Sequence, residues 1–440
     1  MEKQVAIVGA GISGLLACKY MLSKGFRPIV FEASNGVGGV WTKTVETTKI
    51  QSPKSYYQFS DFPWPSSDHP NQNQVLDYIQ SYARHFDLVK HIKFNTKVCG
   101  IEYEGPSEEE MQSWSLWGGT GEPFRSDGKW KVTIEDKQSL STVVHVVDFV
   151  ILCIERFSDV PNIPEFPANK GPEAFHFMEN ADMDYETAAK FVTGKQVTVV
   201  GYQKSAMDIA MECSNANGVE NPCTVLYKTE HWNVPDYLPW GVPLAYIYFN
   251  RFAELLVHKP GEGFLLNLLA TLLAPSEVTP LKTDLVILAT GFRGDKKLKD
   301  IFVSRTFQDY IVGSQDAILP LYRECIHGRI PQLAVVGISE SVSNLYSSEM
   351  RCRWLAELLA GTFKVPSIKE MEKNVKQWDE YAKQYAGEYY RKSCIGALHL
   401  WYNDQLCKDM GWNHKRKKGM LAGLFEPYGP MVYAPTAKTT

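Results

Sequence analysis

The sequence predicts an α/β protein with two strand–turn–helix units in parallel sheets, and three observations carry this prediction. An apolar strand at residues 5–8 breaks at once into a glycine-rich turn and a helix. A second pattern of this kind begins at Lys195, after a proline-rich stretch at 156–172 that has the composition of a linker. Two later apolar strands, at 283–288 and 333–336, each run into a glycine. In a parallel sheet, that end of a strand is where ligands bind, although either glycine alone could be an ordinary turn.

The first glycine-rich turn has the spacing G-x-G-x-x-G, with glycines at positions 9, 11 and 14. In such a turn Gly9 permits the tight bend, Gly11 lets the backbone approach a pyrophosphate, and Gly14 allows close packing of helix on strand. The start of the following helix then offers free N–H groups and a positive dipole end to phosphate oxygens. The sequence therefore predicts a dinucleotide site here.

The second strand of this unit, residues 28–31, ends on Glu32. A carboxylate about 20 residues after the glycine turn binds ribose hydroxyls in dinucleotide units. Because an acid accepts hydroxyl groups and repels a 2′-phosphate, Glu32 favours FAD or NAD over NADP. A glycine-rich turn without a ligand is the alternative, and the complete set of strand, helix and acid argues against it.

The second unit has a looser turn. Its strand, residues 195–200, leads into Gly201, but Gln203 stands at the middle glycine position, and Ala206 stands at the third, where alanine is tolerated. The next strand ends on basic and hydroxyl residues, Lys228 and Thr229. These groups could bind a ribose 2′-phosphate, so the pattern favours an NADPH site over a purely structural unit.

Composition excludes several other classes of protein. The 440 residues are enough for about two or three domains, and a net charge of −4 leaves no basic footprint for nucleic acid. The nine cysteines are scattered without a C-x-x-C pair, and no signal peptide precedes the first strand, so we expect reduced thiols and a cytoplasmic location. The longest apolar run, 264–274, is too short for a membrane span. No metal-ligand spacing is present, so no metal site is predicted.

Further motifs extend the pattern along almost the whole chain. They are Gly-Gly-Val-Trp at 38–41, Asp-Phe-Pro-Trp-Pro at 61–65, Leu-Ala-Thr-Gly-Phe at 288–292, Ile-His at 326–327 and Ser-Asn-Leu-Tyr-Ser-Ser-Glu at 343–349. In this order, and together with the first glycine turn, they resemble the flavin-containing monooxygenase family. The resemblance is greatest to its plant members, in the group that includes N-hydroxylases of cyclic amino acids.

The resemblance implies two Rossmann-like dinucleotide-binding domains, with the NADPH domain inserted in the FAD domain. The expected divisions are residues 1–155 for the first part of the FAD domain and 156–280 for the NADPH domain. Residues 281–440 would hold the second part of the FAD domain and the C-terminal helices. Elsewhere, the periodicity predicts a helix at 74–86 and strands at 97–103, 129–135 and 143–153.

The resemblance also implies a mechanism and its partners. NADPH reduces FAD, and the reduced flavin captures dioxygen as a peroxyflavin. A small-molecule substrate with a soft nucleophile, an amine nitrogen or a thioether sulfur, then attacks the distal oxygen. The cofactor supplies the chemistry, while the protein positions and shields it.

The resemblance further implies the residues of the site. Gln51 would stand near the flavin edge as the catalytic hydrogen-bond donor, although it could equally be an ordinary loop glutamine. Thr290 and Gly291, after a later strand, are predicted to bind a cofactor. The predicted cofactor-binding residues on the FAD side are Gly9, Gly11, Gly14, Glu32, Gly39 and Trp41. On the NADPH side they are Gly201, Ser205, Lys228 and Thr229.

Three features depart from the family pattern. In the signature F-x-G-x-x-x-H, Phe177 replaces the glycine and Ala181 replaces the histidine. Glu155 stands where relatives usually have glycine, and the join at 274–279 shortens the NADPH domain. Two alternatives to a coupled monooxygenase therefore stay open: a degenerate relative that binds FAD without turnover, and an uncoupled NADPH oxidase that releases hydrogen peroxide.

Overall fold

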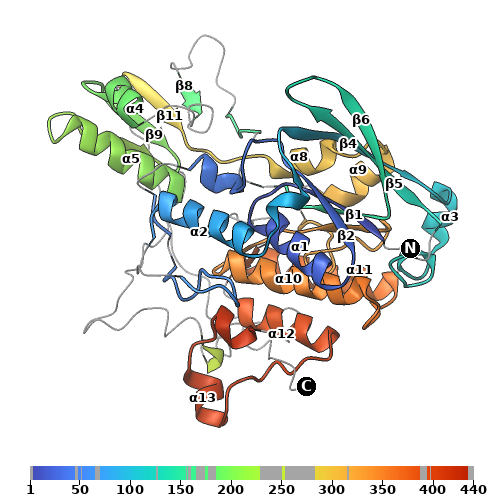
Figure 1. Ribbon diagram of the computed structural model, residues 1–440. Helices are drawn as coiled ribbons and strands as arrows, with labels where there is room; N and C mark the ends of the chain where they lie inside the picture. The colour runs from blue at the N-terminus through green and yellow to red at the C-terminus, as the bar shows by residue number, and fades with distance from the viewer. Residues whose placement is uncertain are drawn as a thin grey trace.

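Two parallel sheets form the framework of the protein (Figure 1). The computed structural model describes residues 3–44, 48–50, 52–64, 70–124, 127–154, 156, 160–164, 174–176, 185–227, 250–252, 283–314, 317–386, 394–396 and 398–434. The first sheet has the strand order β12-β7-β1-β2-β3, with every pair parallel. Its strands are β1 (Gln4–Val8), β2 (Arg27–Phe31), β3 (Ile92–Lys93), β7 (Phe149–Leu152) and β12 (Leu333–Val335).

Alternate residues of the central strand β1 enter two different cores. Val5 and Ile7 belong to the core that also contains helices α1 (Ile12–Ser23) and α10 (Asn344–Leu359). Ala6 and Val8 point to the other face, where a three-stranded antiparallel sheet packs. Because both faces are covered, the strand is apolar and buried at each position from 5 to 8, as parallel strands usually are.

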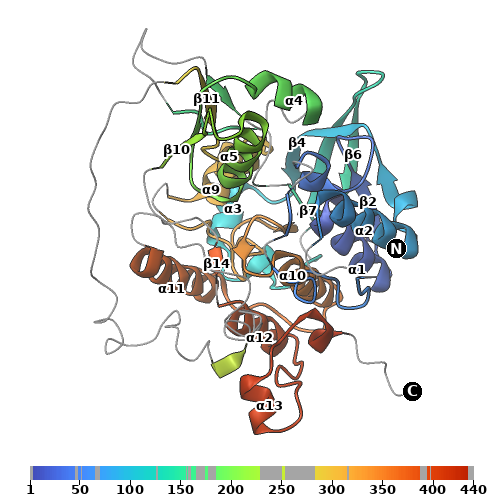
Figure 2. The same cartoon turned by 90° about the vertical axis from the view of Figure 1, so that its left-hand side faces the viewer.

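The second sheet has the order β10-β9-β11-β8 and is also parallel. Its elements are β8 (Ala174–His176), β9 (Val197–Val200), β10 (Thr224–Leu226) and β11 (Leu285–Leu288), with helices α4 (Tyr185–Val192) and α5 (Lys204–Asn217). They form a separate unit at the upper left of Figure 1 and at the top of Figure 2. The chain leaves the first sheet after β7, builds the second, and returns to the first with β12, so the predicted insertion of one unit in the other is confirmed. The exact residue boundaries of the domains stay a prediction.

The antiparallel sheet contains β4 (Thr96–Glu104), β5 (Lys129–Asp136) and β6 (Thr142–Val147). The prediction of one strand over 143–153 is wrong, because β6 and β7 are separate strands in different sheets. Asp148 lies at the break: its N–H donates to the Gln4 carbonyl, and its carboxylate accepts from the Gln4 N–H at 2.8 Å. These two hydrogen bonds fix the point at which the chain passes from one sheet to the other. The apolar pattern of the sequence does not show this point.

The predicted helix at 74–86 is α2 (Gln72–His85), which begins two residues earlier because Asn71 and Gln74 form a capping box. The other helices are α3 (Glu108–Ser113), α8 (Gly294–Asp300), α9 (Arg305–Val312), α11 (Ile368–Ala386), α12 (His399–Asp409) and α13 (Met420–Phe425). Short 3₁₀ turns are η1 (Gly39–Thr42), η2 (Val89–His91), η3 (Trp117–Gly119) and η8 (Pro430–Tyr433), and β13 (Glu340–Ser341) pairs with β14 (Cys394–Gly396). In the parts of the chain that the structure describes, no helix combines the length and apolarity that crossing a bilayer requires.

Candidate functional site

The first glycine turn is so tightly packed that two of its positions exclude any side chain. Gly9 has φ +102°, and a Cβ there would lie 2.6 Å from the carbonyl oxygen of Cys153. A Cβ on Gly14 would lie 1.9 Å from the carbonyl oxygen of Gly9. Because both neighbours are backbone atoms, neither contact could relax by a side-chain rotation. The close approach of α1 to β1 therefore depends on these two glycines.

The segment carrying Gly39 and Trp41 packs directly on this turn. A Cβ on Gly11 would meet the Cα of Gly39 at 3.4 Å, and Gly39 itself has φ +58°. The N–H of Gly38 donates to the carbonyl of Ala10. Thus η1 and the glycine turn lie against each other, although some 25 residues separate them in the sequence.

Glu32 reaches back from the end of β2 to the glycine turn. Its Oε2 accepts the N–H of Ala10 at 2.7 Å, and its Oε1 accepts the N–H and hydroxyl of Ser34 at 2.8 and 2.7 Å. A carboxylate has about four acceptor positions, so three protein donors leave capacity for one ribose hydroxyl. The carboxylate thus lies where the spacing in the sequence predicts it.

The residues of this turn fit an anionic dinucleotide. Gly11 stands at the N-cap of α1, and no side chain in the described residues caps that helix. The first turn of the helix therefore directs its N–H groups outward, where they can bind phosphate oxygens. A Cβ on Gly11 would occupy the narrow space beside Gly39. The donors and the open backbone suit a pyrophosphate next to Glu32.

The second glycine turn has the same tight start but a different helix cap. Gly201 has φ +134°, and a Cβ there would lie 2.5 Å from the carbonyl oxygen of Ala289. Ser205 is exposed in the first turn of α5, and Gln203 is the N-cap without a side-chain hydrogen bond to the helix. Gly201 and Ser205 therefore lie together at the N-terminal end of α5, as the sequence predicts.

Thr290 and Gly291 lie at the crossover between the two sheets. They follow β11, which pairs with β9 and β8 of the second sheet. The hydroxyl of Thr290 donates to the carbonyl of Asn162 at 2.5 Å, and the N–H of Asn162 donates to the carbonyl of Gly291 at 2.8 Å. Hydrogen bonds thus join the two residues to the linker between the units. No local sequence pattern predicts this contact, because the partners are 128 residues apart.

A buried contact joins the two units. The hydroxyl of Thr48 donates to Oδ2 of Asp208 at 2.9 Å, and both residues are buried. Lys204, in the first turn of α5, forms an ion pair with Oδ1 of the same carboxylate. Neither residue belongs to a recognisable motif, so the sequence does not predict this pair.

Several predicted residues fall outside the described part of the chain. These are Gln51, Lys228 and Thr229 among the site residues, and Glu155, Phe177, Ala181 and the 274–279 join among the departures. In the described residues there is no group of three or more His, Cys, Asp or Glu side chains able to hold a metal ion.

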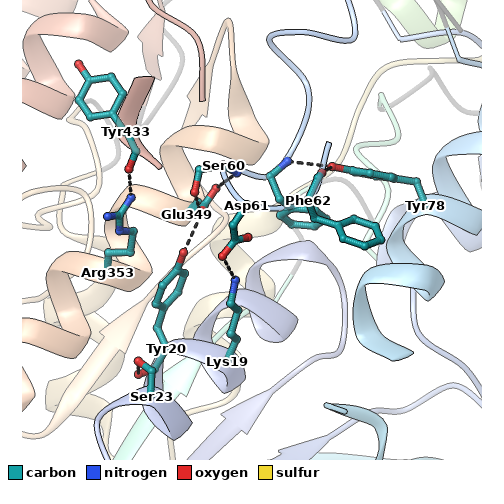
Figure 3. Close-up of polar contacts among 11 residues, drawn as sticks. Lys19, Tyr20, Ser23, Ser60, Asp61, Phe62, Tyr78, Glu349, Arg353 and Tyr433 are labelled. Atoms are coloured by element: carbon teal, nitrogen blue, oxygen red, sulfur yellow. Dashed lines mark hydrogen bonds and ion pairs between the residues drawn. The ribbon is translucent and has the colours of Figure 1, made fainter. Parts of the chain in front are cut away.

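A second buried cluster lies near the first glycine turn, around Glu349 (Figure 3). Its carboxylate accepts hydrogen bonds from α1 and from the loop 52–64. Burial is the main cause that raises the pKa of Tyr20 and lowers the pKa of Lys19, and for Lys19 the hydrogen bond and charge of Asp61 oppose this lowering. Glu349 ends one of the family motifs, but its residue type alone gave no sign of this role.

Comparisons with known proteins agree with this arrangement. Residues 2–272 match the family described as FMO-like, flavin-binding monooxygenase-like. The chain is 34% identical over 521 residues to the Arabidopsis thaliana protein named "Probable flavin-containing monooxygenase 1", an alignment that covers 98% of the chain and 96% of the relative. It is 26% identical over 480 residues to Homo sapiens flavin-containing monooxygenase 1, covering 92% of the chain and 82% of the relative.

A solved structure, S-allyl-L-cysteine S-oxygenase from Allium sativum, is similar with a TM-score of 0.68 at 18% identity, covering 94% of the chain and 89% of that protein. At this identity the likeness shows the fold. The matches confirm the resemblance, the two-unit fold and the enzyme class predicted from the sequence. The chain therefore belongs to the flavin-binding monooxygenase family, and its cofactors are FAD and NADPH.

Proposed function

We propose that the protein uses NADPH and dioxygen to oxygenate a soft nitrogen or sulfur nucleophile in a small molecule. The observation that carries this proposal is the pairing of two glycine turns in adjacent units, joined by the Thr48–Asp208 hydrogen bond. One turn has an acid beside it and the other leads to a strand that ends on basic and hydroxyl residues. Two cofactors with different ribose groups are therefore accommodated side by side.

On the FAD side, Glu32 binds a ribose hydroxyl and the N-terminus of α1 binds the pyrophosphate. Gly39 and Trp41 would lie along the flavin, since η1 packs against the glycine turn. Thr290 and Gly291, at the crossover, would complete the cofactor-binding set beside the linker residue Asn162. Gly9, Gly11 and Gly14 let the backbone come close enough to the pyrophosphate for these contacts.

On the NADPH side, Gly201 and Ser205 bind the pyrophosphate at the start of α5, and Lys228 and Thr229 bind the 2′-phosphate. Lys204 does not serve this purpose, because Asp208 neutralises its charge. Gln51 acts near the flavin edge, three residues after Thr48, which is fixed to the second unit. Its amide would donate a hydrogen bond at the point where the two cofactors meet.

Bound FAD supplies the redox chemistry, since it accepts hydride from NADPH and activates dioxygen. The chain contributes binding, orientation and exclusion of water, and it needs no nucleophilic side chain or metal of its own. An amine or a thioether suits this reaction because both carry a polarisable lone pair. A thioether is also the substrate named for the garlic S-oxygenase. We place the enzyme in the cytoplasm, in keeping with its scattered cysteines.

One experiment tests the proposal directly: anaerobic addition of NADPH to the purified protein while the flavin absorbance is followed. Bleaching of a yellow protein is the expected result, since it requires both nucleotide sites. A yellow protein that does not bleach would leave an FAD-binding relative without turnover, as Phe177 and Ala181 suggest. Aerobic NADPH consumption that is independent of amines and thioethers and yields stoichiometric hydrogen peroxide would identify the uncoupled oxidase.

A further inference from the structure

A carboxylate with no exposed surface joins three segments that are far apart in the sequence. Glu349 of α10 is 0% exposed. Its Oε1 accepts the hydroxyl of Tyr20 at 2.6 Å and the hydroxyl of Ser60 at 2.5 Å, and its Oε2 accepts the N–H of Ser60 at 2.9 Å. Figure 3 shows Tyr20 rising from α1 and Ser60 descending from the loop 52–64 onto this one side chain.

An ion pair lies beside the Glu349 contacts. Lys19, adjacent to Tyr20 on α1, forms an ion pair with Asp61, adjacent to Ser60 in the loop. The Lys19 ammonium also lies 3.7 Å from the centre of the Phe86 ring. Two neighbouring residues of α1 therefore hold two neighbouring residues of the loop. A buried carboxylate is stable only with such donors and nearby positive charge.

The loop 52–64 has further anchors at residues 52, 56 and 59. The hydroxyl of Ser52 donates to the carbonyl of Val342 at 3.0 Å, and the hydroxyl of Ser343 donates to the carbonyl of Tyr56 at 2.7 Å. Further along, Tyr78 of α2 accepts the N–H of Phe59 at 3.0 Å. The links from the loop to α1, the helix of the glycine turn, are instead the Glu349 contacts and the Lys19–Asp61 ion pair.

The loop continues this connection to the flavin side. The indole N–H of Trp41 donates to the hydroxyl of Tyr57 at 3.1 Å, with the ring centres 6.0 Å apart. Trp41 belongs to η1, whose Gly39 packs on Gly11 of the turn. A path of direct contacts therefore leads from Glu349 through the loop to the backbone beside the predicted pyrophosphate.

We propose that Glu349 is a positioning residue of the monooxygenase: it holds the loop 52–64 against α1 and α10, so that Tyr57 and Trp41 form a fixed wall beside the flavin. The inference rests on the proposed FAD site for its functional half. Its structural half, that Glu349 holds the loop, is independent of any cofactor. The wall matters because water or movement at the flavin face diverts activated oxygen to hydrogen peroxide.

A carboxylate is required here because every neighbour of its two oxygens donates. In Glu349→Gln, one of the two positions becomes an NH₂ group, which cannot accept from Tyr20 or from Ser60. At least one buried donor then loses its acceptor, while the volume of the side chain is unchanged. The substitution therefore loosens the loop without opening a cavity.

The matched control is Glu357→Gln on the same helix. Glu357 pairs with Lys24 at 2.7 Å and so joins α10 to α1 as Glu349 does, but its partner is at the far end of α1 and not in the loop. Three readouts are compared in the holoenzymes: hydrogen exchange of residues 52–64, the visible absorbance spectrum of bound FAD, and hydrogen peroxide released per NADPH consumed.

For Glu349→Gln we expect exchange in 52–64 to rise by about tenfold or more, a shifted flavin spectrum, and more peroxide per NADPH, with an unchanged KM for NADPH. Glu357→Gln should match the wild type in all three. Wild-type exchange and spectrum in Glu349→Gln, or equal changes in the control, would overturn the inference. If Glu349→Gln does not fold, Tyr20→Phe serves instead, because it removes one donor and keeps the carboxylate. Tyr20→Phe should give smaller changes in the same direction. No change in this variant would also overturn the inference.

Failure of the proposed function gives a different pattern. If the wild-type protein binds FAD but NADPH does not bleach it, the proposed reaction is refuted. Hydrogen exchange and the flavin spectrum of the variants still test whether Glu349 positions the loop. If the wild-type protein binds no flavin, both the proposed reaction and the positioning role of Glu349 beside the flavin are refuted. Exchange of 52–64 then decides only whether Glu349 holds the loop.

Discussion

Thr48 donates a hydrogen bond of 2.9 Å to Asp208 across the boundary between the two units. Thr48 precedes the predicted flavin-edge residue by three positions, and Asp208 lies in the second turn of α5, next to the predicted pyrophosphate site. Both residues are buried, with 8% and 7% of their surface exposed. In the proposed arrangement, the relative position of the two cofactors therefore depends in part on one hydroxyl group.

Thr48→Val should weaken NADPH binding and leave FAD in place. The substitution keeps the shape of the side chain but leaves Oδ2 of Asp208 without its donor, a loss of about 1–3 kcal/mol that raises KM for NADPH by about five- to one-hundredfold. Steady-state kinetics measure this. Thr193→Val, which removes an exposed hydroxyl bond to Ala189 within the second unit, is the control and should leave KM unchanged.

Gly11→Leu should abolish retention of FAD. Already a Cβ at Gly11 lies 3.4 Å from the Cα of Gly39, so the longer side chain fills the space through which the backbone approaches the pyrophosphate. The visible absorbance of the purified protein reports the bound flavin. Gly36→Leu is the comparison, because a Cβ at Gly36 meets nothing within 4 Å. A Gly11→Leu protein that stays yellow would contradict the placement of the FAD site.

Glu32→Ala should weaken FAD binding by about ten- to one-hundredfold, since hydrogen bonds to a charged group contribute about 1.5–3 kcal/mol. The substitution removes the proposed ribose acceptor and also releases Ala10 and Ser34. Equilibrium dialysis with FAD measures the change. Ser34→Ala removes only one donor to Glu32 and should have a much smaller effect; equal losses in the two variants would show that Glu32 acts only by ordering its loop.

His327 should make the protein less stable as the pH falls below 6.5. Burial, and secondarily the charge of Arg329, lowers the pKa of His327 from 6.5 to about 3. The unfolded chain therefore binds a proton at this residue between these pH values, while the folded protein does not. Stability from the neutral imidazole is present above pH 6.5 and falls by about 1.4 kcal/mol per pH unit below it.

The neutral ring accepts the N–H of Arg329 at 3.1 Å and stacks on Tyr310 with ring centres 5.6 Å apart. His327→Gln should remove most of this dependence between pH 6.5 and 5, a range above the ordinary titration of carboxylates. Urea unfolding at a series of pH values gives the slope for each protein. An unchanged slope in the variant would show that the histidine is protonated in the folded state.

The parts of the fold that local patterns specify could be predicted. Gly9, Gly14 and Glu32 belong to one strand–turn–helix–strand unit, so a spacing of some 20 residues is enough to relate them. The break at Asp148 could not be predicted, since both sides of it are apolar and β-branched. There the choice between two sheets depends on a hydrogen-bond exchange with Gln4, which is 144 residues away.

The candidate site shows the same limit. Trp41 and Gly201 belong to turns that a sequence motif describes. Glu349 ends a family motif and Asp208 belongs to none, but each is a charged residue on a helix, where solvent exposure is the usual outcome. Their burial depends on partners in Ser60 and Thr48, from segments 289 and 160 residues distant. Only the folded arrangement identifies them.

The position of β12 at the edge of the first sheet has a consequence for folding during synthesis. Chains emerge from the ribosome in sequence order and domains fold as they emerge. All four strands of the second sheet are synthesised before residues 333–335, the last strand of the first. The inserted unit is thus complete while β7 still has an open edge, so a nascent chain arrested before Leu333 would present unpaired backbone to chaperones and to other copies.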